Sequence, residues 1–126
     1  MSYAELLDSK RHKPANHGIE PRWMPDAMFD FQKFVAEYAI RKGRCAVFLD
    51  TGLGKTIIEL TTAVNYCEHT GKPVLILTPL AVAFQFIKEA AKFGIDSIEY
   101  SKDGKHNAKI VVCNYERLDK FNADDF

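Results

Sequence analysis

The sequence predicts an α/β domain with a mostly parallel sheet and flanking helices. Three features predict it: short apolar runs typical of buried strands, segments with apolar residues three and four positions apart, and glycine or proline at most of the boundaries between them. Strands that alternate with helices of 10 to 15 residues are joined by right-handed crossovers, and such connections place the strands parallel.

The first elements follow from prolines and from helical spacing. Residues 1–27 hold three prolines and no sustained period, so we expect an irregular arm there and the folded domain over residues 28–126. A helix is predicted over residues 27–42 and ends before Gly43. Its expected core face consists of apolar side chains three and four positions apart, namely Met28, Phe31, Phe34, Val35, Tyr38 and Ala39.

The rest of the chain alternates in the same way. Residues 45–49 form an apolar run too short for a helix and predict a strand buried on both faces. The remaining expected elements are a helix over 55–69, a strand over 74–78, a helix over 81–93, strands over 97–100 and 109–113, and a short helix over 115–121 with Asn114 as a candidate cap. The helix over 81–93 should bury one face, made of Val82, Phe86, Ala90 and Phe93.

Composition limits the class of protein. The 126 residues suit one globular domain, and 17 basic residues balance 17 acidic ones, so any contact with nucleic acid must be local. Three widely spaced cysteines in apolar stretches indicate reduced thiols, and the four histidines have no metal-like spacing and are expected as solvent or cap residues. No apolar run approaches 18 residues and no signal peptide is present, so we expect a cytoplasmic protein.

The segment Asp50-Thr51-Gly52-Leu53-Gly54-Lys55-Thr56 lies between a predicted strand and a predicted helix. That context places backbone N–H groups and a helix N-terminus around one point, which stabilises an anion such as a phosphate. Lys55 is expected on the β- and γ-phosphates and Thr56 on magnesium. The full phosphate-loop pattern has a glycine where this chain has Leu49. The alternative is a loop with a surface lysine before a helix, and the strand-loop-helix context favours the phosphate loop.

This loop resembles motif I of superfamily 2 helicases, particularly the Swi/Snf-like and DEAD/DEAH-box proteins of phages and prophages. Three further segments follow the family's order: residues 29–32 resemble its Q-motif, residues 74–80 its motif Ia, and residues 110–118 its motif Ib region. The resemblance runs from about Ser9 to the end of the chain. It implies a P-loop fold, part of a RecA-like domain, with ATP and Mg²⁺ as cofactors and a nucleic acid, DNA in preference to RNA, as partner.

The resemblance also implies roles for single residues. Gln32 would read the adenine edge, for which an amide supplies both a donor and an acceptor. Thr51, Gly52, Leu53, Gly54, Lys55 and Thr56 would bind the nucleotide, and Thr78, Pro79, Leu80, Asn114 and Tyr115 would face a nucleic-acid backbone. Simpler interpretations stay open for some of them: an exposed helical glutamine for Gln32, a strand stop at Thr78 and Pro79, and a helix cap at Asn114.

Two parts of the family's machinery do not occur in these 126 residues: an apolar strand ending in Asp-Glu, and a second RecA-like domain with its arginine finger. The pair Asp124-Asp125 follows a polar stretch and is not assigned as catalytic. We therefore expect a chain that binds ATP but hydrolyses little of it, either the N-terminal segment of a helicase or translocase or a stand-alone module, such as a phage decoy, that acts on a partner protein. An uncovered sheet edge would favour self-association. A small P-loop kinase or GTPase is a weaker third interpretation, because no Asn-Lys-x-Asp is present.

Overall fold

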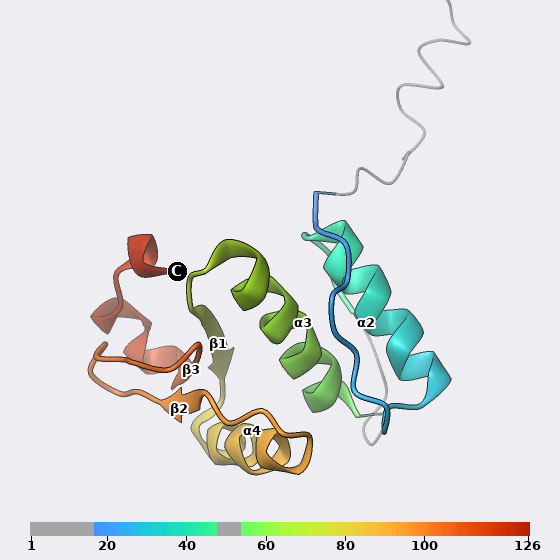
Figure 1. The fold of residues 1–126 in the computed structure, drawn as a ribbon. Coiled ribbons are helices and arrows are strands. Elements are labelled where there is room, and N and C mark those ends of the chain that lie inside the picture. The colour runs from blue at the N-terminus through green and yellow to red at the C-terminus, as the bar shows by residue number, and fades with distance from the viewer. Residues whose placement is uncertain (1–16, 48–53) are drawn as a thin grey trace, which may run out of the picture.

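The computed structural model describes residues 17–47 and 54–126 (Figure 1). Its elements in chain order are α2 (Asp30–Lys42), α3 (Lys55–Thr70), β1 (Val74–Thr78), α4 (Leu80–Lys92), β2 (Ile98–Tyr100), β3 (Ile110–Asn114) and the 3-10 helices η1 (Tyr115–Lys120) and η2 (Ala123–Asp125). All but η2 agree with a predicted element to within about three residues, and the short helix after β3 is a 3-10 helix. The 3-10 helix η2 was not predicted, because a surface loop was expected there. None of the described helices is long and apolar enough to cross a membrane.

The three described strands form a parallel sheet in the order β1-β3-β2. All five residues of β3 are buried, because β3 lies between two strands and carries an unbroken apolar run. On β1, Val74 pairs with Ile110 and Thr78 with Asn114, so the carboxyl ends of these two strands are level. The predicted fold class, an α/β domain with a parallel sheet and flanking helices, is confirmed at this level.

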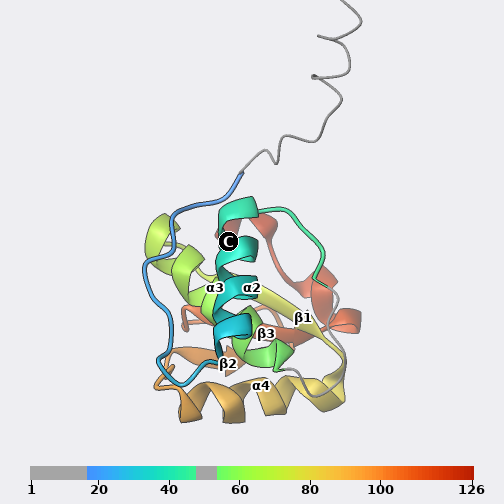
Figure 2. The ribbon, with the colours of Figure 1, turned by 90° about the vertical axis from the view of Figure 1, so that its right-hand side faces the viewer.

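The main core lies between the sheet and helices α3 and α4. Leu60 of α3, Phe86 and Ala90 of α4, and Ile110 and Val112 of β3 are all at most 4% exposed in it. The predicted face of α4 is confirmed in its centre at Phe86 and Ala90, with its outer members Val82 and Phe93 partly buried against the same cluster. Figure 2 shows α4 running beneath the sheet, so this layer sets the position of the strand ends.

Helix α2 packs against α3, and its predicted buried face is wrong for its aromatic members, while Met28 is buried as expected. The buried residues of α2 are Gln32, Ala36 and Ile40, four positions apart, whereas Phe34 is 72% exposed and Tyr38 46% exposed. A small residue at the contact lets two helices approach closely, and the fully buried Ala36 supplies it here. The aromatic stripe therefore faces outward, and Figure 1 shows α2 on the far side of α3 from the sheet.

The predicted strand over residues 45–49 is not observed in its described part. Residues 45–47 are exposed and belong to no strand, while residues 48 and 49 lie outside the described residues. An apolar run becomes a strand only where a neighbouring strand completes its hydrogen bonds. Between residues 45–47 and the edge of β1 lies a groove, so β1 does not supply those bonds.

Residues 17–29 form no helix or strand and are tied to the helices by main-chain hydrogen bonds. Asn65 of α3 is fully buried and accepts from the N–H groups of Arg22 at 2.6 Å and Trp23 at 3.0 Å. Its side-chain amide donates to the carbonyl of Trp23 at 2.9 Å. Ile19 N–H donates to the Ile40 carbonyl at the end of α2. Described residues of the predicted arm thus follow a defined path over α2 and α3.

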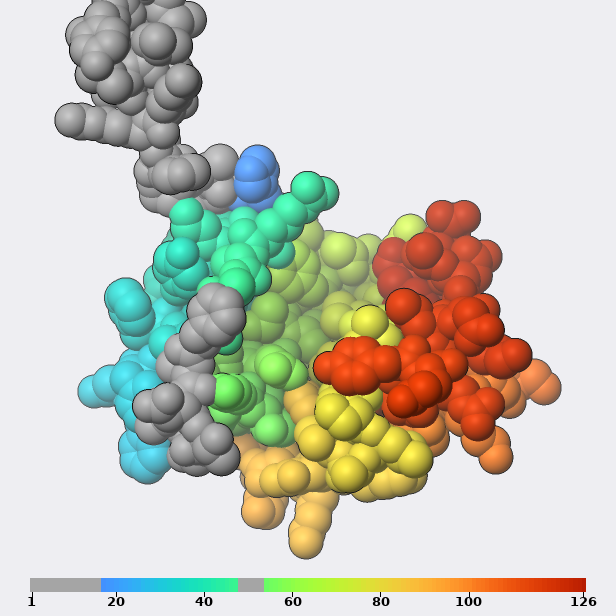
Figure 3. Space-filling model, turned by 180° about the vertical axis from the view of Figure 1, so that it is seen from behind, coloured from blue at the N-terminus to red at the C-terminus, as the bar shows by residue number. Residues whose placement is uncertain are grey.

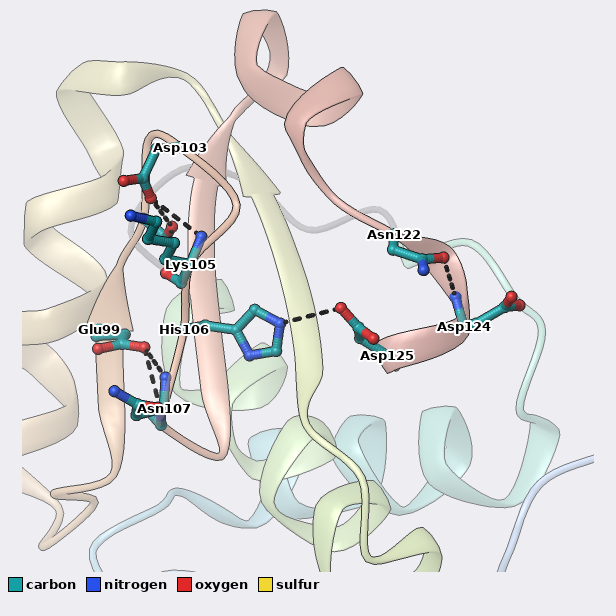
Figure 4. Close-up of polar contacts among 10 residues, drawn as sticks. Glu99, Asp103, Lys105, His106, Asn107, Asn122, Asp124 and Asp125 are labelled. Carbon is teal, nitrogen blue, oxygen red and sulfur yellow. Dashed lines mark hydrogen bonds and ion pairs between the residues drawn. The ribbon is translucent and has the colours of Figure 1, made fainter.

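The C-terminal residues fold back toward the beginning of β1. His106, expected as a solvent or cap residue, has a side chain only 14% exposed, and its ring lies 5.0 Å from that of Phe126 and 6.4 Å from that of Phe121. Its Nε2 lies 3.6 Å from Asp125 Oδ2, as Figure 4 shows. The Glu99 carboxylate accepts two main-chain N–H groups from the same loop and holds it against β2. The prediction for His106 is wrong because η2 covers it.

Candidate functional site

The N-terminus of α3 is the helix end where the sequence predicts a phosphate site. Gly54 is its N-cap residue in the left-handed region, with φ of 77°, and no side-chain hydrogen bond caps the helix from the described residues. The first four N–H groups of any α-helix have no partner within the helix. Lys55 is exposed and Thr56 half-buried in the first turn. Among the described residues, this end of α3 therefore offers main-chain N–H groups without a side-chain cap, the positive end of a helix dipole and a lysine.

Gln32 lies against this helix end. A Cβ added to Gly54 would collide with Gln32 Nε2, so the glycine leaves room for the amide. Gln32 Oε1 accepts from the Phe29 N–H at 2.9 Å, and the residue is 8% exposed. The alternative of an exposed helical glutamine is therefore wrong. The structure brings together two residues that lie 22 positions apart and that the resemblance assigns to one nucleotide site.

The N-terminus of α3 also lies near the carboxyl ends of β1 and β3, which are level with each other. Because α3 leads into β1 through a short turn, the first turn of α3 lies beside the carboxyl end of β1 (Figure 1). Lys55 and Leu77 line one groove. In open α/β sheets the carboxyl ends of the strands are the usual place for a ligand.

The predicted nucleic-acid residues divide into a buried pair and an exposed group. Thr78 and Asn114 are paired in register and are 3% and 6% exposed. Leu80 is 52% and Tyr115 58% exposed, and Pro79 is exposed beside them. A nucleic-acid backbone at this edge would meet Pro79, Leu80 and Tyr115, and the buried Thr78 and Asn114 would lie beneath them.

Asn114 does not cap η1 through its side chain, so that interpretation is wrong. Its Oδ1 accepts from the Tyr100 hydroxyl at 2.7 Å, and its Nδ2 donates to Glu116 Oε2 at 2.7 Å. A hydrogen bond from its own main chain and the bond from Asn114 lower the pKa of the Glu116 carboxyl. The two hydrogen bonds that link Tyr100, Asn114 and Glu116 hold the turn in which Tyr115 lies exposed. Thr78 Oγ1 is buried without a hydrogen-bond partner among the described residues.

Sequence reasoning missed Tyr100, Glu116 and Glu59. Tyr100 reaches Asn114 because β2 pairs with β3, which no local pattern shows, whereas Glu116 lies only two positions after Asn114. Glu59 follows Lys55 by four positions, a spacing that places both on one helix face. Glu59 is exposed at the surface, yet partial desolvation of its carboxyl raises its pKa, and the charge of Lys55 partly offsets that effect.

The other predicted nucleotide residues, Thr51, Gly52 and Leu53, lie outside the described residues, so their roles stay predictions. The described residues hold no group of three or more His, Cys, Asp or Glu side chains placed to bind a metal ion. Asp125 faces His106 beside the beginning of β1, at the opposite end of the sheet from Lys55. Asp124 and Asp125 belong to η2, away from Lys55.

Comparison with known proteins gives one similarity. Over 76 residues the chain is 36% identical to the mouse (Mus musculus) protein "DNA annealing helicase and endonuclease ZRANB3". The matched stretch is 56% of this chain and 7% of that protein, so the similarity concerns a small part of a much longer molecule. No family model matches the chain, and no solved structure matches it. The chain is thus similar, over about half its length, to a segment of a helicase.

Proposed function

We propose that this chain binds ATP with magnesium at the N-terminus of α3, as a helicase-related segment of the superfamily 2 type. One observation carries the proposal: α3 begins at a left-handed Gly54 against which the Gln32 amide rests, directly before Lys55 and Thr56. The residues fit the group, because a Cβ at Gly54 would collide with the Gln32 amide, so only glycine lets that amide lie against the end of α3.

The chain's own groups divide the work of binding. The N–H groups of the first turn of α3 donate to phosphate oxygens, and Lys55 Nζ neutralises their charge. The Thr56 hydroxyl would hold the magnesium ion through an oxygen of the kind that this ion prefers, and the ion would supply positive charge next to the phosphates. By the resemblance, the Gln32 amide would read the base, and its Oε1 accepts from the Phe29 N–H.

A nucleic acid would lie across the carboxyl ends of β1 and β3. The exposed Pro79, Leu80 and Tyr115 surround that edge, and the buried Thr78 hydroxyl beneath them has no partner among the described residues. The similarity to a protein named as a DNA annealing helicase favours DNA over RNA. Contacts of this kind go to the backbone and need no net positive charge.

Binding without appreciable hydrolysis is the expected activity of these residues alone. In phosphoryl transfer a carboxylate commonly positions the magnesium or the attacking water. The carboxylate nearest in sequence to the site among the described residues is Glu59, and its raised pKa reflects partial desolvation. The acidic pair Asp124-Asp125 lies at the opposite end of the sheet from Lys55. Turnover therefore requires groups beyond those described.

Calorimetric titration of the chain with ATP and magnesium tests the proposal. We expect one saturable event that Lys55→Ala weakens at least tenfold and that Lys72→Ala, an exposed lysine at the opposite end of α3, leaves unchanged. Gln32→Ala should reduce the preference for ATP over GTP. If both lysine variants lose the same amount of ATP affinity, ATP binds through non-specific charge attraction. If a folded chain releases no binding heat with ATP and magnesium, the proposed site is refuted.

A further inference from the structure

The aromatic stripe of α2 consists of four exposed residues, Phe29, Phe31, Phe34 and Tyr38. The last three follow at spacings of three and four, so they lie in one row along the helix. Phe29, just before the helix, is 68% exposed and stacks its ring on that of Phe31. Figure 3 shows the cyan surface of α2 at one side of the molecule, far from the red C-terminal elements at the other side. The described part of the chain leaves this stripe open to solvent.

The stripe is large enough to mark an interaction surface. At about 200 Å² for an aromatic side chain, the exposed fractions amount to roughly 450 Å². A contiguous apolar patch of that size on a small protein often serves to bind another molecule. The contact of α2 with α3 does not use these rings, because Gln32, Ala36 and Ile40 are the buried residues of the helix. The stripe is therefore available to a partner.

We propose that the aromatic stripe binds the same stripe of a second copy of this chain, with the two α2 helices antiparallel. The charges beside the stripe carry this choice of partner. Asp30 lies in the first turn of α2 and Arg41 in its last turn. They are 11 residues apart, about three turns, so both lie on one flank of the stripe, at opposite ends. A two-fold axis through the middle of the stripe exchanges the ends and keeps the flank, so Asp30 of each copy faces Arg41 of the other.

Both charged groups are able to make this contact. Asp30 is exposed and has no ion pair among the described residues. Arg41 donates from Nε to Glu37 at 3.0 Å and from Nη1 to Glu20 at 2.6 Å. A guanidinium carries five N–H donors, so further donors remain for a third carboxylate. Two parallel helices would instead bring Asp30 to the level of its own copy, where like charges repel.

The size of the stripe sets the strength of the pair. The rings of two copies together bury about 900 Å², whereas stable complexes bury about 1,200–2,000 Å². The pair is therefore reversible, with a Kd on the order of 0.1 mM. This contact is separate from the open edge of β1, where the sequence suggests self-association.

Sedimentation of the full chain over a range of concentrations tests the pairing. We expect a monomer at about 0.02 mM and a mass that approaches that of a dimer at about 1 mM. Phe34→Gln should raise the Kd at least tenfold, because it removes the most exposed ring of the stripe. Phe84→Gln, at a 58% exposed ring on α4, should leave the Kd unchanged. A monomer at all concentrations would overturn the proposal, and so would an equal loss of pairing in the two variants.

Charge variants test the antiparallel direction. Asp30→Lys should raise the Kd about fivefold, because two lysines then face two Arg41 side chains. Asp96→Lys makes the same change of charge at an exposed position between α4 and β2, and it should leave the Kd within about twofold of the parent's. In about 1 M salt the effect of Asp30→Lys should disappear, since the Debye length there is about 3 Å. A Kd that Asp30→Lys leaves unchanged or lowers would overturn the antiparallel pairing.

Amide NMR shifts of the unmodified chain locate the contact over the same concentrations. We expect shifts that depend on concentration at Phe31, Phe34 and Tyr38, and constant positions at Leu75 and Leu77 of β1. The opposite result, with shifts at Leu75 and Leu77 and a constant α2, would overturn the proposal, because the sheet edge would then join the two copies.

Discussion

Gly54→Ala should both destabilise the fold and abolish nucleotide binding. Gly54 has φ of 77°, and a Cβ there would collide with the buried amide of Gln32. Gly71, at the other end of α3, has φ of 70° and nothing within 4 Å of an added Cβ. The two glycines therefore separate backbone strain from steric collision within one helix.

The magnitudes follow from these two geometries. The left-handed conformation costs an alanine about 1–2 kcal/mol, and this applies at both glycines. At Gly54 the displaced Gln32 also loses its bond to the Phe29 N–H, worth about 1 kcal/mol. We expect about 2–3 kcal/mol of destabilisation for Gly54→Ala and about 1–2 kcal/mol for Gly71→Ala.

Urea unfolding of both variants and of the double variant Gly54→Ala/Gln32→Ala measures these terms. The double variant should recover part of the stability, since the smaller side chain removes the collision. Nucleotide binding should be lost in Gly54→Ala and retained in Gly71→Ala. Equal destabilisation and equal binding in the two single variants would refute the contact between Gly54 and Gln32.

Three further predictions concern the fold and its charges. Asn65→Ala should cost about 3–5 kcal/mol in urea unfolding, because it leaves buried main-chain groups without partners; a loss below 0.5 kcal/mol, roughly the scatter of surface variants, would contradict the network. The free energy of unfolding of Phe34→Gln should stay within about 0.5 kcal/mol of the parent's, while Ile40→Ala should lower it by about 2–5 kcal/mol. A larger loss for Phe34→Gln than for Ile40→Ala would mean that α2 buries the aromatic face expected from the sequence. Partial desolvation raises the pKa of Glu59, so its ionised form is less stable in the folded state than in the unfolded state. Glu59→Gln should therefore stabilise the chain at neutral pH, and the gain should vanish as the pH falls below about 4.5, the ordinary value for a glutamate; a gain that persists in acid would contradict desolvation as the cause.

The elements of the sheet and its helices could be predicted because their patterns are local. The unbroken apolar run of β3 matches a strand buried on both faces, and the face of α4 contains Phe86 and Ala90 as expected. The ends of α3 coincide with Gly54 and Gly71, which adopt the left-handed conformation that glycine permits.

What could not be predicted depends on which elements meet. The aromatic stripe of α2 suggests a core face, but α2 meets a helix rather than the sheet, and Ala36 makes that contact. Residues 45–47 have strand composition, but no described strand lies beside them. In the candidate site, Gln32 and Gly54 were assigned through resemblance and are neighbours in space, whereas the pairing of Thr78 with Asn114 follows only from register.

The central claim is that phosphates bind at the N-terminus of α3. Amide NMR shifts measured on addition of magnesium tripolyphosphate, and then of ATP with magnesium, test it most directly. We expect the largest shifts from both ligands at Gly54, Lys55 and Thr56, and an additional shift at the Gln32 side chain with ATP alone. Shifts that gather instead around Lys72 and Lys105, which line a separate pocket at the other end of the sheet, would contradict it.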